Sequence, residues 1–308
     1  MTLPGPVASS VEKALEKYLG TSGSILSASP VGGGCINPSA KVVTESGSTF
    51  FLKWNPSSPP EMFGAEVDGL KTLKKPEALR VPEVIGTGGS GAHEDPGWLL
   101  MEFIPQGRPG PDYGSRLGRG LAALHSAVDM GSEPGFGWTR DNFIGSLNQS
   151  NDPCDDWPTF WRDSRLEPQL RMARDRGHFG GKGGKVLENL LSRLEEVMAT
   201  AGEGGPALLH GDLWSGNFYP DSSGEPVLID PAVYRGTGEV DLAMMELFGS
   251  FPMGFQEAYD EGRGIPPEYD AFRRDLYQLY YLLVHVNLFG GGYVGGSLSA
   301  ARRVLKQF

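Results

Sequence analysis

Apolar residues follow two kinds of spacing along the chain, strand-like in most of the first third and helical in much of the rest. The exception comes first, because residues 8–19 combine a serine cap with apolar positions three and four apart, which predicts a short amphipathic helix. Short apolar runs follow at residues 42–43, 49–53, 81–86 and 98–105, and each predicts a β-strand. The first hundred residues are therefore expected to form a small sheet with accompanying helices.

A charged side chain falls on the apolar stripe of a helix predicted at residues 62–70. Apolar residues repeat there at i, i+4 and i+7, and Glu66 lies on the same face at i+3. A carboxylate that faces inward needs a partner, and Lys53, at the end of a predicted strand, is the best candidate. The alternative is a half-exposed Glu66 at the edge of the stripe and a Lys53 whose stem lies along apolar surface.

Helical spacing dominates beyond the apolar run that ends at Pro105, where the composition changes to that of a loop. We place a boundary in a linker at residues 102–110, between an N-terminal part of residues 1–104 and a C-terminal part of residues 105–308. Residues 129–157 are rich in loop-forming residues with scattered aromatic side chains. Helices are predicted at residues 114–128, 158–177, 184–201, 241–261 and 268–289.

One histidine lies on the aromatic stripe of the last of these helices. His285 shares a face with tyrosines at helical spacing. Aromatic stripes of this kind belong to a core more often than to a binding site. We therefore interpret His285 as a hydrogen-bonded core histidine, with a contact to substrate as the alternative.

The composition is that of an ordinary globular chain except for its 45 glycines among 308 residues, against a usual share of about 7%. Three of them stand before Cys35, where glycine would let backbone N–H groups approach a phosphate, although hairpin turns have the same glycine pattern.

A formal net charge of −11 argues against nucleic acid or an anionic membrane as a partner. Two cysteines far apart in the sequence argue against a disulfide framework or a zinc site. No apolar window approaches 18 residues and the start lacks a leader pattern, so we expect a cytoplasmic protein.

The residues with the clearest chemistry are the segment HGDLWSGN at residues 210–217 and the apolar run that ends at Asp230. They follow the kinase pattern of a catalytic loop and a metal-binding strand end, with Gly211 where that pattern has arginine. Phosphoryl transfer needs a carboxylate near the acceptor hydroxyl, a neutral oxygen ligand for Mg²⁺ and a carboxylate that bridges the metal. Asp212, Asn217 and Asp230 fit these roles in that order. A hydrophilic turn is the alternative, and the apolar strands on both sides favour the metal site.

With these residues in this order, the chain resembles small-molecule kinases, and more narrowly the fructosamine-3-kinase (ketosamine-3-kinase) family. The pattern H-G-D-x-x-x-x-N is shared with aminoglycoside and choline kinases, whereas LWSG inside it is particular to ketosamine kinases. The resemblance spans residues 32–249. It is carried by GGCI at residues 33–36, WPTF at 157–160 with Arg165 and Leu166, HGDLWSGN at 210–217, IDPA at 229–232, and residues 239–249.

The resemblance implies a bilobal, protein-kinase-like α+β fold, with a small antiparallel sheet and a helix in the N-terminal lobe and a larger, mainly helical C-terminal lobe. It implies ATP- and Mg²⁺-dependent phosphorylation of the 3-hydroxyl of a ketosamine, the adduct of a sugar with an amine of a small molecule or protein. The phosphorylated adduct falls apart and frees the amine, so the implied function is deglycation, a form of protein repair.

The same resemblance gives a role to each matching residue. Asp212 is the implied catalytic base, and Asn217 and Asp230 are the implied Mg²⁺ ligands. Trp214, beside the base, is expected to pack on the sugar, and a core tryptophan that steadies the loop is the alternative. Nucleotide contacts are implied for Gly33, Gly34, Cys35, Lys53 and Glu66 and, around the adenine in the linker, for Glu102, Phe103 and Ile104.

Two further hypotheses concern assembly and competing functions. We expect a monomer, but a thiol in a glycine loop is accessible, so Cys35 could join two chains under oxidation; a small residue at a tight position is the explanation that we favour for the protein in cells. A kinase for another alcohol, such as an aminoglycoside or choline, would keep every catalytic residue. A nucleotide-binding pseudokinase is the other alternative, and the complete set of catalytic residues argues against it.

Overall fold

The chain divides into two compact units. The computed structural model describes residues 2–32, 37–59, 61–90, 95–127 and 135–308. The N-terminal unit comprises Met1–Gly110 and Phe218–Pro231, and the C-terminal unit comprises Pro111–Asn217 and Ala232–Phe308. The first boundary falls at the end of the predicted linker, whereas the return of residues 218–231 to the N-terminal unit differs from the simple two-part division predicted from the sequence.

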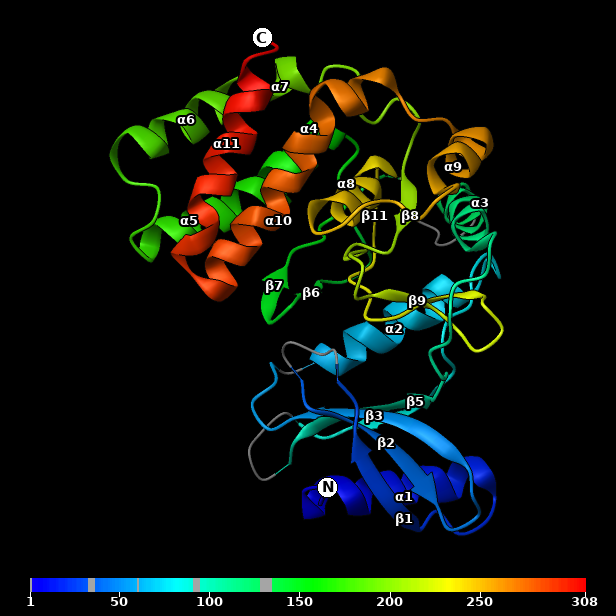
Figure 1. The fold of residues 1–308 in the computed structure, drawn as a ribbon. Coiled ribbons are helices and arrows are strands. Elements are labelled where there is room, and N and C mark those ends of the chain that lie inside the picture. Colours follow the sequence, from blue (N-terminus) through cyan, green and yellow to red (C-terminus); the bar gives the residue numbers. More distant parts are fainter. Residues whose placement is uncertain (1, 33–36, 60, 91–94, 128–134) are drawn as a thin grey trace. The chain divides into compact units, whose positions relative to one another are not determined.

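The N-terminal unit is built on a five-stranded sheet in the order β1-β2-β3-β5-β4, with every neighbouring pair antiparallel. A bulge between Val84 and Gly86 shifts the register at the β4 edge. The strands are β1 (Ile25–Pro30), β2 (Ser39–Thr44), β3 (Thr49–Asn55), β4 (Val84–Gly88) and β5 (Gly97–Glu102) (Figure 1).

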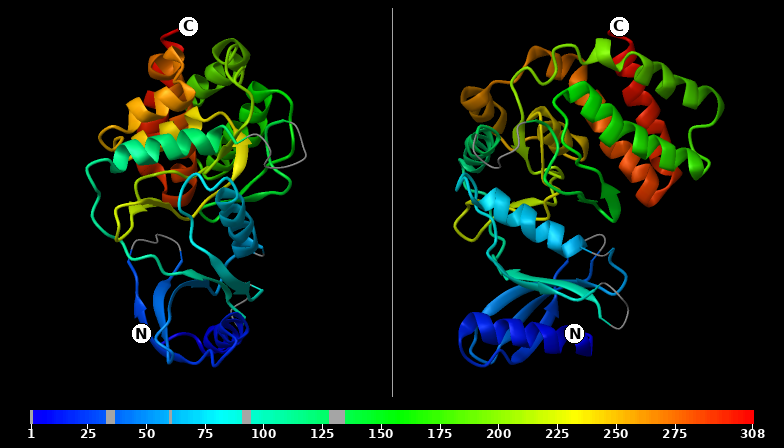
Figure 2. Two further views of the ribbon diagram at one scale, coloured as in Figure 1. Left: turned by 90° about the vertical axis from the view of Figure 1, so that its right-hand side faces the viewer. Right: turned by 180° about the vertical axis from the view of Figure 1, so that it is seen from behind.

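Two helices, α1 (Gly5–Leu19) and α2 (Met62–Lys74), cover opposite faces of this sheet (Figure 2). The apolar stripe of α1, which includes Val11 and Leu15, is fully buried in one cluster with strand residues such as Leu52. Because side chains alternate along a strand, the next residue, Lys53, points to the face that α2 covers. The alternation within β3 thus places one charged side chain between the sheet and α2.

A short hairpin of β9 (Phe218–Pro220) and β10 (Pro226–Leu228) completes the N-terminal unit. A main-chain hydrogen bond from Gly107 N to Pro220 O (2.8 Å) ties it to the linker, and one from Leu228 N to Arg80 O (2.9 Å) ties it to the segment before β4. The Arg80 guanidinium also bonds the buried carboxylate of Asp221. These contacts join residues far apart in sequence, which explains why the hairpin belongs to the N-terminal unit.

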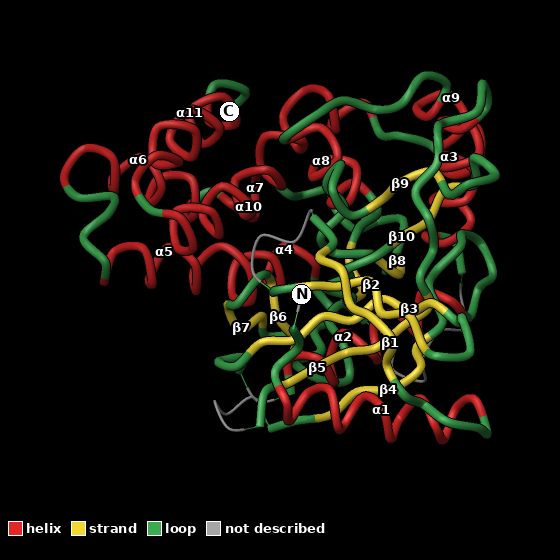
Figure 3. Tube along the Cα trace, turned by 60° about the horizontal axis from the view of Figure 1, so that its bottom comes forward, coloured by secondary structure: helices red, strands yellow, loops and turns green. Residues whose placement is uncertain are grey.

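The C-terminal unit is mainly helical, and its longest helix, α10 (Arg274–Phe289), packs against α5, α8 and α11 (Figure 3). Two short antiparallel ladders, β8 with β11 and β6 with β7, lie among the helices. None of the helices in the described part of the chain is both long and apolar enough to cross a membrane. The other elements are α3 (Tyr113–His125), β6 (Asn142–Ile144), β7 (Leu147–Gln149), α4 (Trp157–Phe160), η1 (Trp161–Leu166), α5 (Glu167–Asp175), α6 (Gly181–Ser192), α7 (Leu194–Val197), β8 (Ala207–Leu209), β11 (Tyr234–Gly236), α8 (Glu239–Leu247), α9 (Phe255–Arg263), η2 (Tyr269–Arg273), η3 (Gly291–Tyr293) and α11 (Val294–Leu305).

Some helices predicted as continuous are interrupted. The prediction of one helix at residues 241–261 is wrong, because α8 and α9 are separated by a loop that contains Pro252 and ends at Gly254 with a φ of +81°. The helix predicted at residues 158–177 includes a π-helical stretch, η1, just before Pro168, which has no N–H to donate. Proline and glycine thus set the breaks that apolar spacing alone does not reveal.

Candidate active site

Three charged side chains meet in the N-terminal unit. Lys53 Nζ lies 2.6 Å from Glu66 Oε1 and 2.6 Å from Asp230 Oδ1, and Lys53 is only 4% exposed. Lys53 comes from β3, Glu66 from the sheet-facing side of α2, and Asp230 follows β10. Asp230 has a φ of +55°, a backbone conformation that non-glycine residues seldom adopt. The predicted ion pair of Lys53 with Glu66 is therefore present, and Asp230 joins it.

The charges in this triad are unequal, because two carboxylates share one ammonium group. Burial acts to lower the pKa of Lys53, but Asp230 and Glu66 outweigh it and raise that pKa, so Lys53 is charged at neutral pH. Burial raises the pKa of Glu66 to about 7; Lys53 acts to lower it and Asp230 to raise it further. A divalent cation at Asp230 would offset the surplus negative charge.

The predicted catalytic loop, residues 210–217 of the C-terminal unit, is held by side chains that hydrogen-bond to its main chain. Fully buried Asp241 accepts hydrogen bonds from His210 N (2.7 Å) and Gly211 N (2.9 Å), and the Tyr281 hydroxyl donates to Gly211 O (2.8 Å). Gly211 has a φ of +83°, and a Cβ added there would lie 2.1 Å from Ala232 O. Only glycine fits this position without strain or collision, which accounts for glycine where the kinase pattern has arginine.

Asp212 and Asn217 meet across this loop. Asn217 Nδ2 lies 2.8 Å from Asp212 O and 3.2 Å from Asp212 Oδ2, so its amide group orients the carboxylate. With the nitrogen turned to Asp212, the amide oxygen of Asn217 is the atom that suits Mg²⁺. The described residues contain no group of three or more His, Cys, Asp and Glu side chains with metal-binding geometry. Of the two predicted Mg²⁺ ligands, Asn217 lies in the C-terminal unit and Asp230 in the N-terminal unit.

The two residues predicted to contact the acceptor both lie in the C-terminal unit. Trp214 is half-buried, and its ring covers Gly216 so closely that a Cβ there would lie 2.3 Å from it. His285 is half-buried among Phe248, Phe289 and Tyr293 rather than fully in the core. Its Nδ1 lies 2.7 Å from Tyr281 O, so Nδ1 carries the proton and Nε2 is an acceptor. Burial lowers the pKa of His285, which keeps the ring neutral.

The predicted nucleotide contacts are only partly described. Gly33, Gly34 and Cys35 lie outside the described residues. In the linker, Glu102 N donates to Glu83 O (2.8 Å), the Glu102 carboxylate pairs with Arg80, and Ile104 O accepts from the Tyr219 hydroxyl (3.1 Å). Because Glu102 N and Ile104 O have these partners, the predicted contacts with a purine edge would fall to Glu102 O, Ile104 N and the main-chain groups of Phe103.

A buried chain of polar groups behind the catalytic loop was not predicted in full from the sequence. His125 Nε2 lies 3.1 Å from Asp241 Oδ2, and His125 Nδ1 lies 2.8 Å from the Tyr259 hydroxyl. Burial lowers the pKa of His125 more than Asp241 raises it, so the ring is neutral. Because a carboxylate only accepts, Nε2–H donates to Asp241 and Nδ1 accepts from Tyr259. In the sequence, the signal for these hydrogen bonds is His125, a polar residue at the end of the buried stripe of α3.

Known proteins resemble the whole chain. The family model described as fructosamine kinase matches residues 7–307. A probable ketoamine kinase of Synechocystis is 41% identical over 90% of this chain and 88% of its own length, and a chloroplastic protein-ribulosamine 3-kinase of Arabidopsis thaliana is 40% identical over 87% and 79%.

Solved structures agree with these relatives. A putative fructosamine-3-kinase of Thermobifida fusca superposes with a TM-score of 0.83 and 34% identity, covering 96% of this chain and 99% of its own. An aminoglycoside phosphotransferase, at a TM-score of 0.61 and 18% identity over 97% of this chain and all of its own, shares the fold alone. The predicted protein-kinase-like α+β fold is thereby confirmed, and the chain belongs to the fructosamine kinase family.

Proposed function

We propose that the protein is an ATP-dependent ketosamine 3-kinase that phosphorylates the 3-hydroxyl of fructosamine or ribulosamine adducts. This proposal rests on the match over nearly the whole chain to relatives of about 40% identity, which are named probable ketoamine kinase and protein-ribulosamine 3-kinase. Phosphorylation at this hydroxyl destabilises the adduct and frees the amine. The expected role is therefore deglycation of small amines or proteins.

In this proposal Asp212 is the catalytic base. The 3-hydroxyl oxygen attacks the γ-phosphorus, the bond from that phosphorus to the β–γ bridging oxygen breaks, ADP leaves, and the hydroxyl proton passes to Asp212. The hydrogen bonds from Asn217 to the backbone and carboxylate of Asp212 support this role, because they fix the direction of the carboxylate. Backbone bonds to Asp241 hold the loop in place during the reaction.

We assign the charged triad to the nucleotide phosphates and the metal. Lys53, held by Glu66, would contact phosphate oxygens, and Asp230 and Asn217 would hold Mg²⁺, which neutralises charge on the phosphates when bound. The two carboxylates around one buried ammonium group support this assignment, because a divalent cation beside Asp230 would favour the charged forms of both. The implied adenine contacts lie in the linker at residues 102–104.

We further propose that Trp214 packs on the sugar and that His285 accepts a hydrogen bond from one of its hydroxyls. Support comes from the half-buried Trp214 ring beside the base and from Nε2 of a neutral His285 as the acceptor atom. Ring faces and a neutral acceptor suit a polyhydroxylated, uncharged substrate portion.

The test is ADP release with ribulosyl-lysine and fructosyl-lysine, beside choline and a panel of aminoglycosides, in wild type and Asp212→Asn. Turnover of a ketosamine, lost by about 10²-fold or more in the variant, is expected. Turnover of an aminoglycoside or choline but of neither ketosamine would show a kinase for another alcohol. No turnover of any acceptor, with ATP still bound, would show a pseudokinase.

The proposed assembly and location complete this picture. We propose a cytoplasmic monomer that can form a covalent dimer through Cys35 under oxidation. Non-reducing gels after peroxide treatment test the dimer. A Cys35→Ala protein that still formed the same covalent dimer would exclude this role for Cys35.

A further inference from the structure

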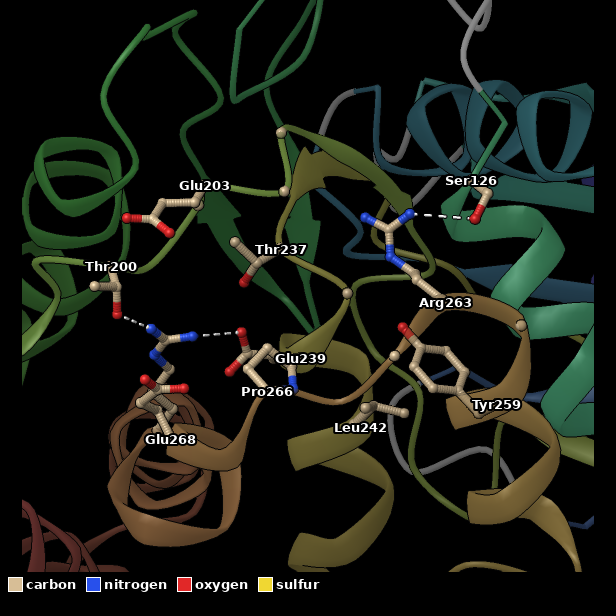
Figure 4. Close-up of a pocket in the computed structure, with 17 residues that line it drawn as sticks. Ser126, Thr200, Glu203, Thr237, Glu239, Leu242, Tyr259, Arg263, Pro266 and Glu268 are labelled. Atoms are coloured by element: carbon tan, nitrogen blue, oxygen red, sulfur yellow. Dashed lines mark hydrogen bonds and ion pairs between the residues drawn. The ribbon is translucent and has the colours of Figure 1, made fainter.

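A cavity of about 570 Å³ lies within the C-terminal unit. Its walls come from the loop before β8, the start of α8, the end of α9 with the loop that follows, and η2 (Figure 4). None of the described residues that line it belongs to the catalytic loop or to the Lys53 triad. The volume is typical of a small-molecule site, and nothing in the proposed reaction uses it.

Two charged side chains in this cavity each have a buried atom without a partner. Arg273 donates to Glu239 Oε1 at 3.0 Å and to the Thr200 hydroxyl, and both charged side chains are at least nine-tenths buried. Among the described residues, Glu239 Oε2 and Arg273 Nε have no hydrogen-bond partner. Buried polar atoms are nearly always paired, so this ion pair has one acceptor and one donor left for a ligand, which reaches them by displacing the side chains that cover both atoms.

The other polar groups define the ligand further. Arg263 is occupied, since its Nη1 donates to His125 O (2.6 Å) and to the Ser126 hydroxyl (3.3 Å). With Glu203 and Glu268, three carboxylates face two guanidinium groups around the cavity, which gives a net charge of −1. Burial raises the pKa of Glu239, against Arg273, and a cation beside this carboxylate would favour its charged form.

An α-amino acid meets these requirements. Its ammonium group supplies donors to Glu239, its carboxylate supplies an acceptor to Arg273, and the two groups lie close together in one small molecule. A basic side chain would balance the remaining negative charge. Lysine is therefore the probe that the cavity fits best.

The cavity also touches the groups that hold the catalytic loop. Tyr259 lines it and contacts His125, and His125 contacts Asp241, which binds the backbone of the loop. Gly238, another lining residue, packs so tightly that a Cβ there would lie 2.6 Å from the Tyr259 hydroxyl and 2.7 Å from His125 Nδ1. A ligand that shifts Gly238 or Tyr259 must therefore also change the buried contact of Tyr259 with His125.

We propose that this cavity is a second ligand site, for a free α-amino acid, and that Tyr259, His125 and Asp241 transmit its occupation to the catalytic loop. Binding is independent of the proposed ketosamine activity, and only the effect on rate rests on it. The amine freed from a glycated amino acid belongs to the same chemical class, so the site would respond to the reaction's own product.

Calorimetric titration of the full chain without nucleotide tests the binding, with lysine, norleucine, n-butylamine and butyrate as probes. Lysine and norleucine are expected to bind at one site, and the two single-group probes at least tenfold more weakly. Equal affinity for lysine and n-butylamine would overturn the α-amino acid assignment, and no binding of either amino acid would overturn the site.

Three variants locate the site. Gly204 lines the cavity, and a Cβ there meets nothing within 4 Å, so Gly204→Phe is expected to fold and to weaken lysine binding at least tenfold. Gly180 is equally open but lies elsewhere, so Gly180→Phe is the matched control and is expected to bind normally. Glu239→Gln is expected to weaken binding similarly. Unchanged affinity in Gly204→Phe and in a folded Glu239→Gln would overturn the proposal.

The coupling is tested by the turnover number at saturating ketosamine. Saturating lysine is expected to change kcat at least threefold in wild type and not in Gly204→Phe, which excludes competition at the acceptor site. Tyr259→Phe removes the hydrogen bond to His125, so it is expected to bind lysine within twofold of wild type and to lose the effect on kcat. A full effect in Tyr259→Phe would overturn this route, and binding without ketosamine turnover would count against the proposed function alone.

Discussion

Replacement of Gly211 by alanine tests whether the backbone of the catalytic loop sets the activity. At a φ of +83°, alanine costs about 1–2 kcal/mol. Its Cβ would also lie 2.1 Å from Ala232 O, whereas ordinary contacts begin at 3.4 Å, so the two must separate by about 1.3 Å. Because Asp212 is the next residue, the proposed base would move with this shift, and a displacement of about 1 Å costs on the order of 10²-fold in rate.

Gly177→Ala is the matched control, since Gly177 also has a φ of +83° but its Cβ would meet nothing within 4 Å. Both variants are expected to lose about 1–2 kcal/mol of unfolding free energy from the torsion, and only Gly211→Ala should also lose about 10²-fold in kcat. Urea unfolding and ADP release measure the two effects. A folded Gly211→Ala enzyme with kcat within threefold of wild type would refute the reasoning.

Three other predictions concern different parts of the molecule. Glu66→Gln leaves Lys53 without one of its two carboxylates, so the KM for ATP is expected to rise about tenfold, near 1.4 kcal/mol; an unchanged KM in initial-rate assays would contradict the assignment. Trp214→Ala should raise the KM for the ketosamine about tenfold without changing the KM for ATP, whereas a purely structural tryptophan would lower the melting temperature alone. Because the pKa of His125 is lowered by burial, the folded chain resists a proton that the unfolded chain accepts, so stability should fall as pH drops below about 6.5. Urea unfolding at several pH values should show a flatter dependence in His125→Asn; an equal slope would exclude this histidine as the source.

Local patterns offered the ion pair of Lys53 and Glu66 as a hypothesis, and the kinase-like order of residues along the chain was needed to favour it. A carboxylate on an inward helical stripe requires a partner, and the preceding strand offers a lysine at its end. The structure places the two atoms 2.6 Å apart. What the pattern could not give is the third member, Asp230, because its contact with Lys53 joins residues 177 apart in sequence and depends on an unusual backbone angle.

The full set of contacts from Tyr259 through His125 to Asp241 could not be predicted from the sequence, for a related physical reason. His125 is 116 residues from Asp241 and 134 from Tyr259, and no spacing rule connects α3, α8 and α9. The close approach of α3 to α9 depends on glycine, since a Cβ at Gly118 would lie 2.3 Å from Phe255 O. A glycine within a helix indicates that another element packs closely there, but the sequence does not show which element it is.

The backbone conformation, which the sequence pattern does not reveal, explains why residue 211 is glycine. The general kinase pattern has arginine at this position, so from the sequence alone glycine is a departure in which the arginine side chain is lost. In the structure it is a requirement, because the left-handed φ and the carbonyl of Ala232 leave no room for a Cβ. The same turn presents the N–H groups of His210 and Gly211 to Asp241. The loop is thus fixed by main-chain hydrogen bonds to one buried carboxylate, so the position of Asp212 depends on Asp241 behind the loop as well as on the loop itself.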